Sequence, residues 1–367
     1  MRSLGPLDST QLQLLPELKR TEELLGWASS EASGRSCDAE IVTMPDLGVP
    51  HNVRRIHGGF LTGALYRWES SVPFVPVDTT VNLCGVSMFR TNAEFADRQS
   101  FANAVERAKA IVERDSSFSW NFDTGNHFVI LAEVREDGAL PRGRYLVLHA
   151  SAAEFKKQYN GLYPAPGNWY SDNIRTFQAK GGRYLRYISG KSAENFGRIV
   201  NMLESYQRQR QRMCAELVVG GAGLGEEILS VLHYGMPDSN SVAIGCQWLP
   251  AIQPIYLLLT RPSEPIYLIE ASSGGDNEVA TQHGARMLTP HGLGVEATAP
   301  LSIQRGRAHL EIAGRRYPLS ASLAGQPFLS IRQFNEDLTL RNVLRDCPGR
   351  VIAKLEQVFS HHRTGDM

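Results

Sequence analysis

The chain has 367 residues, of which 42% are hydrophobic and 21% charged. These ordinary values exclude collagen, coiled coil and wholesale disorder. The 38 Lys and Arg residues balance 38 Asp and Glu residues, which excludes binding of a polyanion by bulk charge but leaves room for a local basic groove. The five cysteines lie far apart without a Cys-x-x-Cys pair, which predicts free thiols in a reducing compartment. Because the chain has no apolar run of about 18 residues and no signal-peptide core, we expect a cytoplasmic protein without membrane contact.

The first 40 residues are expected to form a peripheral segment. Residues 16–25 have the pattern of a short amphipathic helix, and the Ser-rich residues 29–34 are typical of a linker. Short apolar runs at residues 41–44 and 75–81 follow and predict strands.

The middle of the chain mixes long helices with strands. Apolar residues on one face predict a helix over residues 93–113. Strands are expected at residues 128–134 and 145–149, separated by an Asp-Gly turn signal. A second long helix is expected over residues 193–216. Its stretch 207–212, Gln-Arg-Gln-Arg-Gln-Arg, is polar on every face and indicates either a solvated helix surface or an edge that contacts phosphate.

The last third of the chain is rich in predicted strands. They are expected over residues 241–248, 254–260, 265–271 and 310–319, the last as a pair with a turn near Gly314. The second and third share a Pro-Ile-Tyr-Leu tetrapeptide and are expected to form a hairpin. Residues 350–361 are expected to form a terminal helix. Because strands and helices do not alternate regularly, the predicted fold class is α+β.

Five side chains that could bind a metal or act as a nucleophile lie at the ends of predicted strands or in a Gly-flanked loop. They are Cys84, His127, His149, His233 and His283. Imidazole nitrogens and thiolates are good ligands for borderline divalent metals, and strand ends are places where a scaffold holds site residues. No two of them are close enough in sequence to form a local metal motif, so the spacing alone favours a packed or hydrogen-bonded residue over a ligand at each position.

Taken in chain order, these segments resemble those of the RNA-splicing ligase RtcB family. The similar stretches are Asn82-Leu83-Cys84-Gly85, Gly125-Asn126-His127-Phe128, Leu148-His149-Ala150-Ser151, residues 233–240 and Gln282-His283-Gly284-Ala285-Arg286. Val42-Thr43-Met44-Pro45-Asp46 resembles the entry segment of the family, and residues 341–358 resemble its C-terminal helical end. The resemblance extends from about residue 41 to residue 365, and its collinear order is more specific than any single motif.

The resemblance implies an α+β fold with β-sheets around a central metal cleft and flanking helices, in a single catalytic domain over residues 41–367. It implies a GTP- and Mn²⁺-dependent ligase that joins an RNA 3′-phosphate or 2′,3′-cyclic phosphate to a 5′-hydroxyl. In that chemistry a histidine attacks the α-phosphorus of GTP, and the GMP passes to the RNA end. The implied metal ligands are Cys84, His127, His149 and His233. The implied nucleophile is His283, and Asn126 and Arg286 would contact the nucleotide.

Several positions depart from the family pattern. The family aspartate three residues before the cysteine is Val81 here, and the nearest carboxylate is Asp78. A Cys/His site without a carboxylate is softer, so we expect Zn²⁺ or Fe²⁺ in place of Mn²⁺, or a single metal. His291, in a His-Gly-x-Gly segment, is a rival for the role of nucleophile.

These departures leave two other functions open. One is a metal-dependent phosphodiesterase on the same scaffold, because hydrolysis needs only metals and an activated water. The other is a non-catalytic module that binds RNA ends or a protein. Local basic patches for RNA are possible at Arg54-Arg55, residues 208–212 and Arg315-Arg316.

Overall fold

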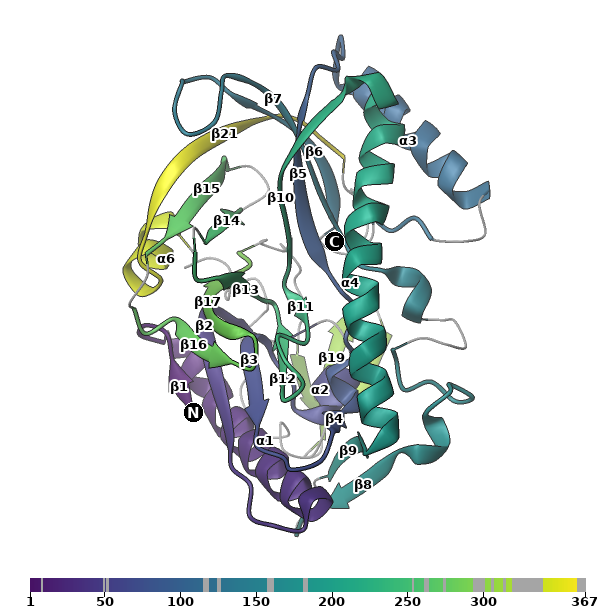
Figure 1. Ribbon diagram of the computed structural model, residues 1–367, viewed down its shortest axis with the longest axis vertical. Helices are drawn as coiled ribbons and strands as arrows, with labels where there is room; N and C mark the ends of the chain where they lie inside the picture. Colours follow the sequence, from purple (N-terminus) through teal and green to yellow (C-terminus); the bar gives the residue numbers. More distant parts are fainter. Residues whose placement is uncertain are drawn as a thin grey trace.

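The computed structural model describes most of the chain. The described residues are 1–7, 9–48, 50, 53–114, 119–123, 127–156, 162–180, 184–252, 254–260, 264–272, 275–292, 301–304, 307–312, 315–318 and 339–361. They form a mixture of helices and sheets (Figure 1), which confirms the predicted α+β class. All five cysteines are buried, and within the described residues none of them forms a disulfide. Within the described residues, no helix combines the length and the apolar character that a membrane crossing requires.

The described strands form five sheets. The first has the order β1 (Arg2–Ser3), β2 (Ala39–Gly48), β3 (Thr62–Trp68), β12 (Ser241–Ile244) and β11 (Tyr234–Gly235). The largest has the order β10 (Leu224–Leu232), β5 (Gly85–Thr91), β7 (Gly143–Ala150), β6 (Phe128–Val134), β21 (Gly349–His361), β15 (Ile266–Ala271) and β14 (Ile255–Leu258). The three-stranded sheets are β13 (Cys246–Pro250), β17 (Gly284–Pro290) and β16 (Glu278–Thr281); β4 (Phe74–Pro76), β9 (Tyr184–Ser189) and β8 (Arg175–Gln178); and β18 (Leu301–Gln304), β19 (Arg307–Ile312) and β20 (Arg315–Pro318).

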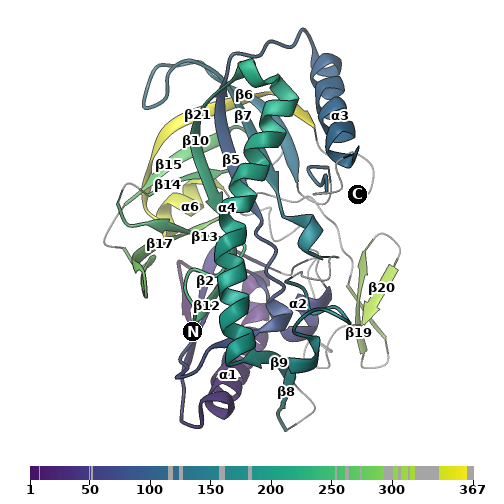
Figure 2. The same ribbon diagram turned by 45° about the vertical axis from the view of Figure 1, so that its right-hand side comes forward.

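Five α-helices occur in the described part of the chain. They are α1 (Ser9–Ser33), α2 (Val53–Gly58), α3 (Arg98–Arg114), α4 (Lys191–Val219) and α6 (Leu340–Asp346). The long helix α4 lies along the molecule and contacts strands of the seven-stranded sheet as well as α3 (Figure 2). Helix α3 buries the apolar face that the sequence predicts, including Phe101, Val105 and Val112. The expected hairpin of β14 and β15 is confirmed, because the two strands pair antiparallel.

The C-terminal segment differs from the expectation. Residues 350–361 are predicted to be helical, but they form most of strand β21. This strand pairs with β15 along one part of its length and with β6 along another. The segment contains Val351, Ile352, Val358 and Phe359, β-branched and aromatic residues that suit a strand. Pairing with the edges of β6 and β15 therefore outweighs the helical spacing of the apolar residues. The resemblance of residues 341–358 to a helical end is wrong beyond α6.

The expected strand over residues 75–81 is also wrong in its second half. Strand β4 ends at Pro76, and Val77–Thr79 form a turn of 3₁₀-helix. Asp78 in this turn accepts hydrogen bonds from the Nε and the Nη2 of the Arg186 guanidinium. This ion pair holds the chain in a turn just before the segment that carries Cys84.

Helix α1 is longer and more deeply packed than the sequence analysis expects. Residues 29–34, predicted to be a linker, include its last turns, where the hydroxyls of Ser29 and Ser30 donate to the carbonyl oxygen of Gly26 at 3.1 and 2.7 Å. Such bonds inside the helix satisfy serine side chains that would otherwise favour a turn. Leu18 and Leu25 are fully buried in the core that α1 shares with the first sheet. The N-terminal segment is therefore part of the core, whereas the division into domains stays a prediction.

Removing the Leu18 side chain should destabilise the whole protein if α1 belongs to the core. We expect Leu18→Ala to lower the free energy of unfolding by about 2–5 kcal/mol, because it leaves a cavity in an apolar cluster. Leu12→Ala is the matched control, because Leu12 is 53% exposed on the same helix and should cost less than about 0.5 kcal/mol. Chemical denaturation measures both, and equal small effects would show that α1 is dispensable for stability.

Candidate metal centre

The register of four neighbouring strands brings Cys84, His127, His149 and His233 to one end of the seven-stranded sheet. Cys84 precedes β5, His127 precedes β6, His149 lies near the end of β7, and His233 follows β10. The strand order is β10-β5-β7-β6, with antiparallel neighbours throughout. The pairs at this end are Leu232 with Gly85, Gly85 with Ala150, and His149 with Phe128. Antiparallel pairing therefore places two strand starts and two strand ends side by side.

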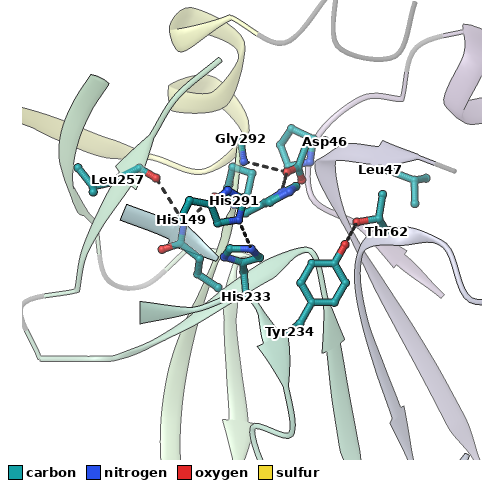
Figure 3. A network of polar contacts seen from close by, with 12 residues as sticks. Asp46, Leu47, Thr62, His149, His233, Tyr234, Leu257, His291 and Gly292 are labelled. Carbon is teal, nitrogen blue, oxygen red and sulfur yellow. Dashed lines mark hydrogen bonds and ion pairs between the residues drawn. The ribbon is translucent and has the colours of Figure 1, made fainter. Parts of the chain in front are cut away.

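The donor atoms of the four side chains converge. The Cys84 Sγ lies 3.3 Å from the His127 Nε2 and 3.2 Å from the His149 Nε2. The His149 Nε2 lies 3.2 Å from the His233 Nε2 (Figure 3). Cys84, His149 and His233 form a buried group whose donor atoms all lie within 4.8 Å of one another. A chain of three short donor contacts thus links a thiol to three imidazoles.

These distances fit the coordination shell of a single metal ion. With metal–nitrogen bonds of roughly 2.0–2.1 Å and a metal–sulfur bond of roughly 2.3 Å, neighbouring donors in a tetrahedral site lie roughly 3.3–3.6 Å apart. The observed separations of 3.2 and 3.3 Å lie close to that range. The sulfur and two nitrogens of Cys84, His149 and His233 form a group that could hold a metal ion, and the His127 Nε2 contacts the same thiol. The residues present therefore fit a bound divalent metal.

The protonation of the imidazoles suits metal binding as well. The His127 Nδ1 donates a hydrogen bond to the backbone oxygen of Asn121 at 2.7 Å, which leaves the lone pair on Nε2, the atom that faces the thiol. Burial lowers the pKa of His233 well below its usual range, and the neighbouring His291, His149 and His127 lower it further. His233 is therefore neutral at physiological pH, as a metal ligand must be.

The backbone around Cys84 is shaped for this close approach. A Cβ added at Gly85 would lie 2.7 Å from both the carbonyl oxygen of Val231 and a methyl group of Leu232. Glycine at this position therefore lets β10 approach β5 and carry His233 to the thiol. Leu83, on the other side of Cys84, has a φ of 55°, a left-handed conformation that costs a non-glycine residue about 1–2 kcal/mol.

No carboxylate from the Cys84 segment joins the centre. Asp78, the carboxylate nearest to the position of the missing family aspartate, is 2% exposed and bound to Arg186. The two carboxylate oxygens already accept from the guanidinium, so Asp78 is committed to its ion pair. The site on the described residues is one of sulfur and nitrogen donors, as its sequence predicts.

A second pair of residues, His291 and Asp46, lies against the cluster. The His291 ring centroid is 4.9 Å from that of His233. The His291 Nδ1 lies 2.6 Å from the Asp46 Oδ2, which also accepts from the backbone nitrogen of Gly292 at 3.1 Å (Figure 3). Asp46 comes from β2 of the first sheet, and His291 directly follows β17. The sequence gives His291 only as a rival and does not foresee a role for Asp46.

The structure does not bring His283 to the cluster. His283 is exposed at the tip of the β16–β17 hairpin, where Thr281 pairs with Gly284. The seven residues of β17 separate this tip from His291, a distance on the order of 20 Å at about 3.3 Å per strand residue. The predicted loop beside the metal centre is therefore a hairpin tip, and the imidazole that lies beside the cluster is that of His291.

The two predicted nucleotide contacts have different outcomes. Asn126 lies outside the described residues. Arg286 is half-buried in the middle of β17, opposite Val279 and Pro250, and its charge acts on Glu204 of α4. The role of Arg286 in binding a nucleotide stays a prediction.

Glu204 should make stability depend on pH. Burial raises the pKa of Glu204 from 4.5 to about 7, and the charge of Arg286 acts in the opposite direction. Because the unfolded carboxyl ionises at lower pH than the folded one, the free energy of unfolding falls as pH rises from about 4.5 to about 7. Glu204→Gln should remove this loss. We expect the variant to exceed the wild type by roughly 1–2 kcal/mol at pH 8, with solvent screening allowed for, and by little at pH 4.5. Denaturation at both pH values checks this, and a difference independent of pH would contradict it.

The arginine patches considered for RNA are largely engaged within the protein. The Arg55 guanidinium is buried and donates to the carbonyl oxygens of Thr79 and Thr80 at 2.8 and 2.7 Å. Arg208 pairs with Glu227 at the surface. The side chains of residues 315 and 316 lie outside the described part of the structure.

The comparisons with known proteins add no family assignment. No protein-family model matches the chain, and no curated protein matches it. The likeness to the RtcB family therefore depends on the short motifs, and the chemistry of the site has to be argued from its own residues.

Proposed function

We propose that the chain is an RtcB-like RNA ligase that depends on a metal and GTP, with His291 as the residue that accepts GMP. The observation that carries the proposal is the position of His291. A carboxylate holds it on one side, and on the other it lies against His233 of the buried Cys84, His149 and His233 group. An activated histidine next to a metal centre is the arrangement that covalent nucleotidyl transfer requires. Simple hydrolysis would not need it.

Asp46 prepares His291 for nucleophilic attack. With Nδ1–H donated to the carboxylate, the lone pair of the neutral ring is on Nε2, which is the nucleophilic atom. The negative charge of Asp46 also stabilises the positive ring that forms when Nε2 bonds to phosphorus. His291 is 12% exposed, whereas His149 and His233 are fully buried. His291 is therefore the most exposed of these three imidazoles.

The proposed reaction has three balanced steps. The His291 Nε2 attacks the α-phosphorus of GTP, so that a P–N bond forms while the P–O bond to pyrophosphate breaks. An RNA 3′-phosphate oxygen then attacks the same phosphorus, which breaks the P–N bond and returns the neutral imidazole. Finally, a 5′-hydroxyl attacks the activated 3′-phosphate and loses its proton to solvent, and GMP leaves as the new phosphodiester forms. The bound metal would stabilise negative charge on the phosphate oxygens, and Cys84, His127, His149 and His233 would hold it.

The test is formation of a covalent adduct. Purified protein is incubated with GTP labelled at the α-phosphate and with Mn²⁺, Zn²⁺ or Fe²⁺ in turn, followed by denaturing electrophoresis. We expect label on the protein with at least one metal, labile in acid and stable in base as a phosphoramidate is. Label at the γ-phosphate should not be retained. The second assay joins RNA with a 3′-phosphate to RNA with a 5′-hydroxyl.

Two variants make this test specific for the site. His291→Ala should lose the adduct, whereas His283→Ala, at the exposed hairpin tip, should form it as the wild type does. No adduct in the metal-loaded wild type would contradict the proposal. Turnover of a 2′,3′-cyclic phosphate without GTP would instead identify a metal-dependent phosphodiesterase.

A further inference from the structure

We infer that three buried polar residues of helix α4, Gln207, Arg210 and Gln211, position the metal ligands. The inference rests on the metal centre of the proposed function. It does not depend on which reaction that centre performs. These residues lie at spacings of three and four, so they share one helix face, and they are only 1%, 2% and 1% exposed. The sequence suggests a solvated or phosphate-contacting stretch here, and the structure corrects both readings for these three residues.

The two glutamines bind the backbone immediately next to metal ligands. The Gln211 Nε2 donates to the carbonyl oxygen of Gly85 at 2.9 Å, and Gly85 follows Cys84. The Gln207 Nε2 donates to the carbonyl oxygen of Ala150 at 2.8 Å, and Ala150 follows His149. Each amide therefore fixes the strand end from which a ligand projects.

Arg210 reaches the third ligand through Asn121. Its Nη2 donates to the Asn121 Oδ1 at 3.0 Å and to the carbonyl oxygen of Ser119. The backbone oxygen of Asn121 in turn accepts from the His127 Nδ1. The positive charge is balanced by Glu154, which lies 3.3 Å from the Arg210 Nε and is equally buried. The segment that orients the His127 ring is therefore held by a buried charged hydrogen bond.

The cost of burying these groups supports a positioning role. Buried polar side chains destabilise a core unless they are hydrogen-bonded, and an apolar face of α4 would pack against the sheet without that cost. Here one helix face carries a guanidinium and two amides, and each of them donates a hydrogen bond to a segment that carries or orients a proposed ligand. A metal shell tolerates displacements of only about 0.5 Å, so rigid anchors next to Cys84, His127 and His149 would preserve its geometry.

The test measures the affinity of the protein for Co²⁺, which reports the ligand field by its absorption spectrum. Gln207→Met and Gln211→Met, alone and together, remove the amide donors while nearly keeping side-chain volume. We expect the double variant to bind Co²⁺ about 10–100-fold more weakly in competition with a chelator, the loss typical of altered outer-shell contacts. The sulfur-to-cobalt charge-transfer band should shift, while the melting temperature of the metal-free protein changes by only a few degrees.

Two further variants separate positioning from folding. Arg210→Lys keeps the charge opposite Glu154 but shortens the reach to Asn121, so it should also weaken Co²⁺ binding even if the glutamine variants fold poorly. Arg208→Ala is the matched control, because Arg208 is exposed on the same helix and should leave affinity and spectrum unchanged. Wild-type affinity and spectrum in folded Gln207→Met, Gln211→Met and Arg210→Lys variants would overturn the inference. A wild type that binds no Co²⁺ would overturn the metal centre itself.

Discussion

The His149→Ala variant should lose its metal. His149 is the central member of the cluster, because its Nε2 lies 3.2 Å from both the Cys84 Sγ and the His233 Nε2. Removing its side chain takes away the nitrogen that contacts both the Cys84 thiol and the His233 imidazole. It also leaves a cavity in a fully buried site. We expect metal content to fall from one ion per chain to a small fraction, as measured by elemental analysis after dialysis against a weak chelator.

The matched control for this variant is His283→Ala. Both substitutions remove one imidazole, but His283 is exposed at a hairpin tip and does not join the cluster. The control should therefore keep one ion per chain and unchanged Co²⁺ absorption. Equal metal content in the two variants would show that the cluster is a set of packed histidines.

The Asp46→Asn variant should form the GMP adduct far more slowly while it keeps its metal. The carboxylate is 2% exposed and accepts from the His291 Nδ1 at 2.6 Å. Asparagine has no charge to stabilise the imidazolium, and its amide group can select the wrong tautomer of the ring. In serine proteases the corresponding change lowers the rate by roughly 10⁴-fold, so we expect a loss of about 10³–10⁴-fold. Single-turnover labelling with GTP measures the rate.

This prediction has its own control. Asp137→Asn removes a carboxylate from an exposed turn, where Asp137 pairs with Arg142, and should leave the labelling rate as it is. Metal analysis of Asp46→Asn must accompany the kinetics, because Asp46 contacts His291 and is not proposed as a metal ligand. An unchanged labelling rate in a metal-loaded Asp46→Asn protein would contradict the proposed role.

Much of the metal centre could be predicted from strand ends. His127 and His149 lie at the ends of the predicted strands 128–134 and 145–149, which form as the neighbours β6 and β7. Cys84 instead precedes β5, a strand that the sequence analysis does not predict. The antiparallel order of these strands could not be read from the sequence, because register depends on pairing between distant segments. The candidate ligand residues could therefore be predicted from the sequence, whereas their proximity follows only from the pairing of the strands.

The nucleophile shows why a local motif is insufficient. Residues 282–286 resemble the family motif more closely than the segment around His291 does, yet they form the tip of an exposed hairpin. The partner of His291, Asp46, is 245 residues away in the chain. A contact of that separation leaves no periodic signal in a single sequence.

The two other misreadings have related physical causes. The polar run of α4 resembles a solvent-exposed surface because the sequence pattern does not reveal backbone carbonyl partners, such as those of Gly85 and Ala150. In the segment that forms β21, the spacing of the apolar residues is compatible with a helix as well as with a strand. Its strand conformation is decided by the free edges of β6 and β15.

X-ray absorption spectroscopy at the metal edge shows which atoms surround the bound ion. It is measured on protein purified without added metal and quantified by elemental analysis. We expect one ion per chain, with one sulfur at about 2.3 Å and nitrogen donors at about 2.0–2.1 Å. Loss of the sulfur scatterer in the Cys84→Ser variant would identify the Cys84 thiolate as the sulfur ligand. A ligand shell without sulfur, two stoichiometric ions per chain, or no stoichiometric metal at all would show that Cys84 and the histidines do not form a site for a single metal ion.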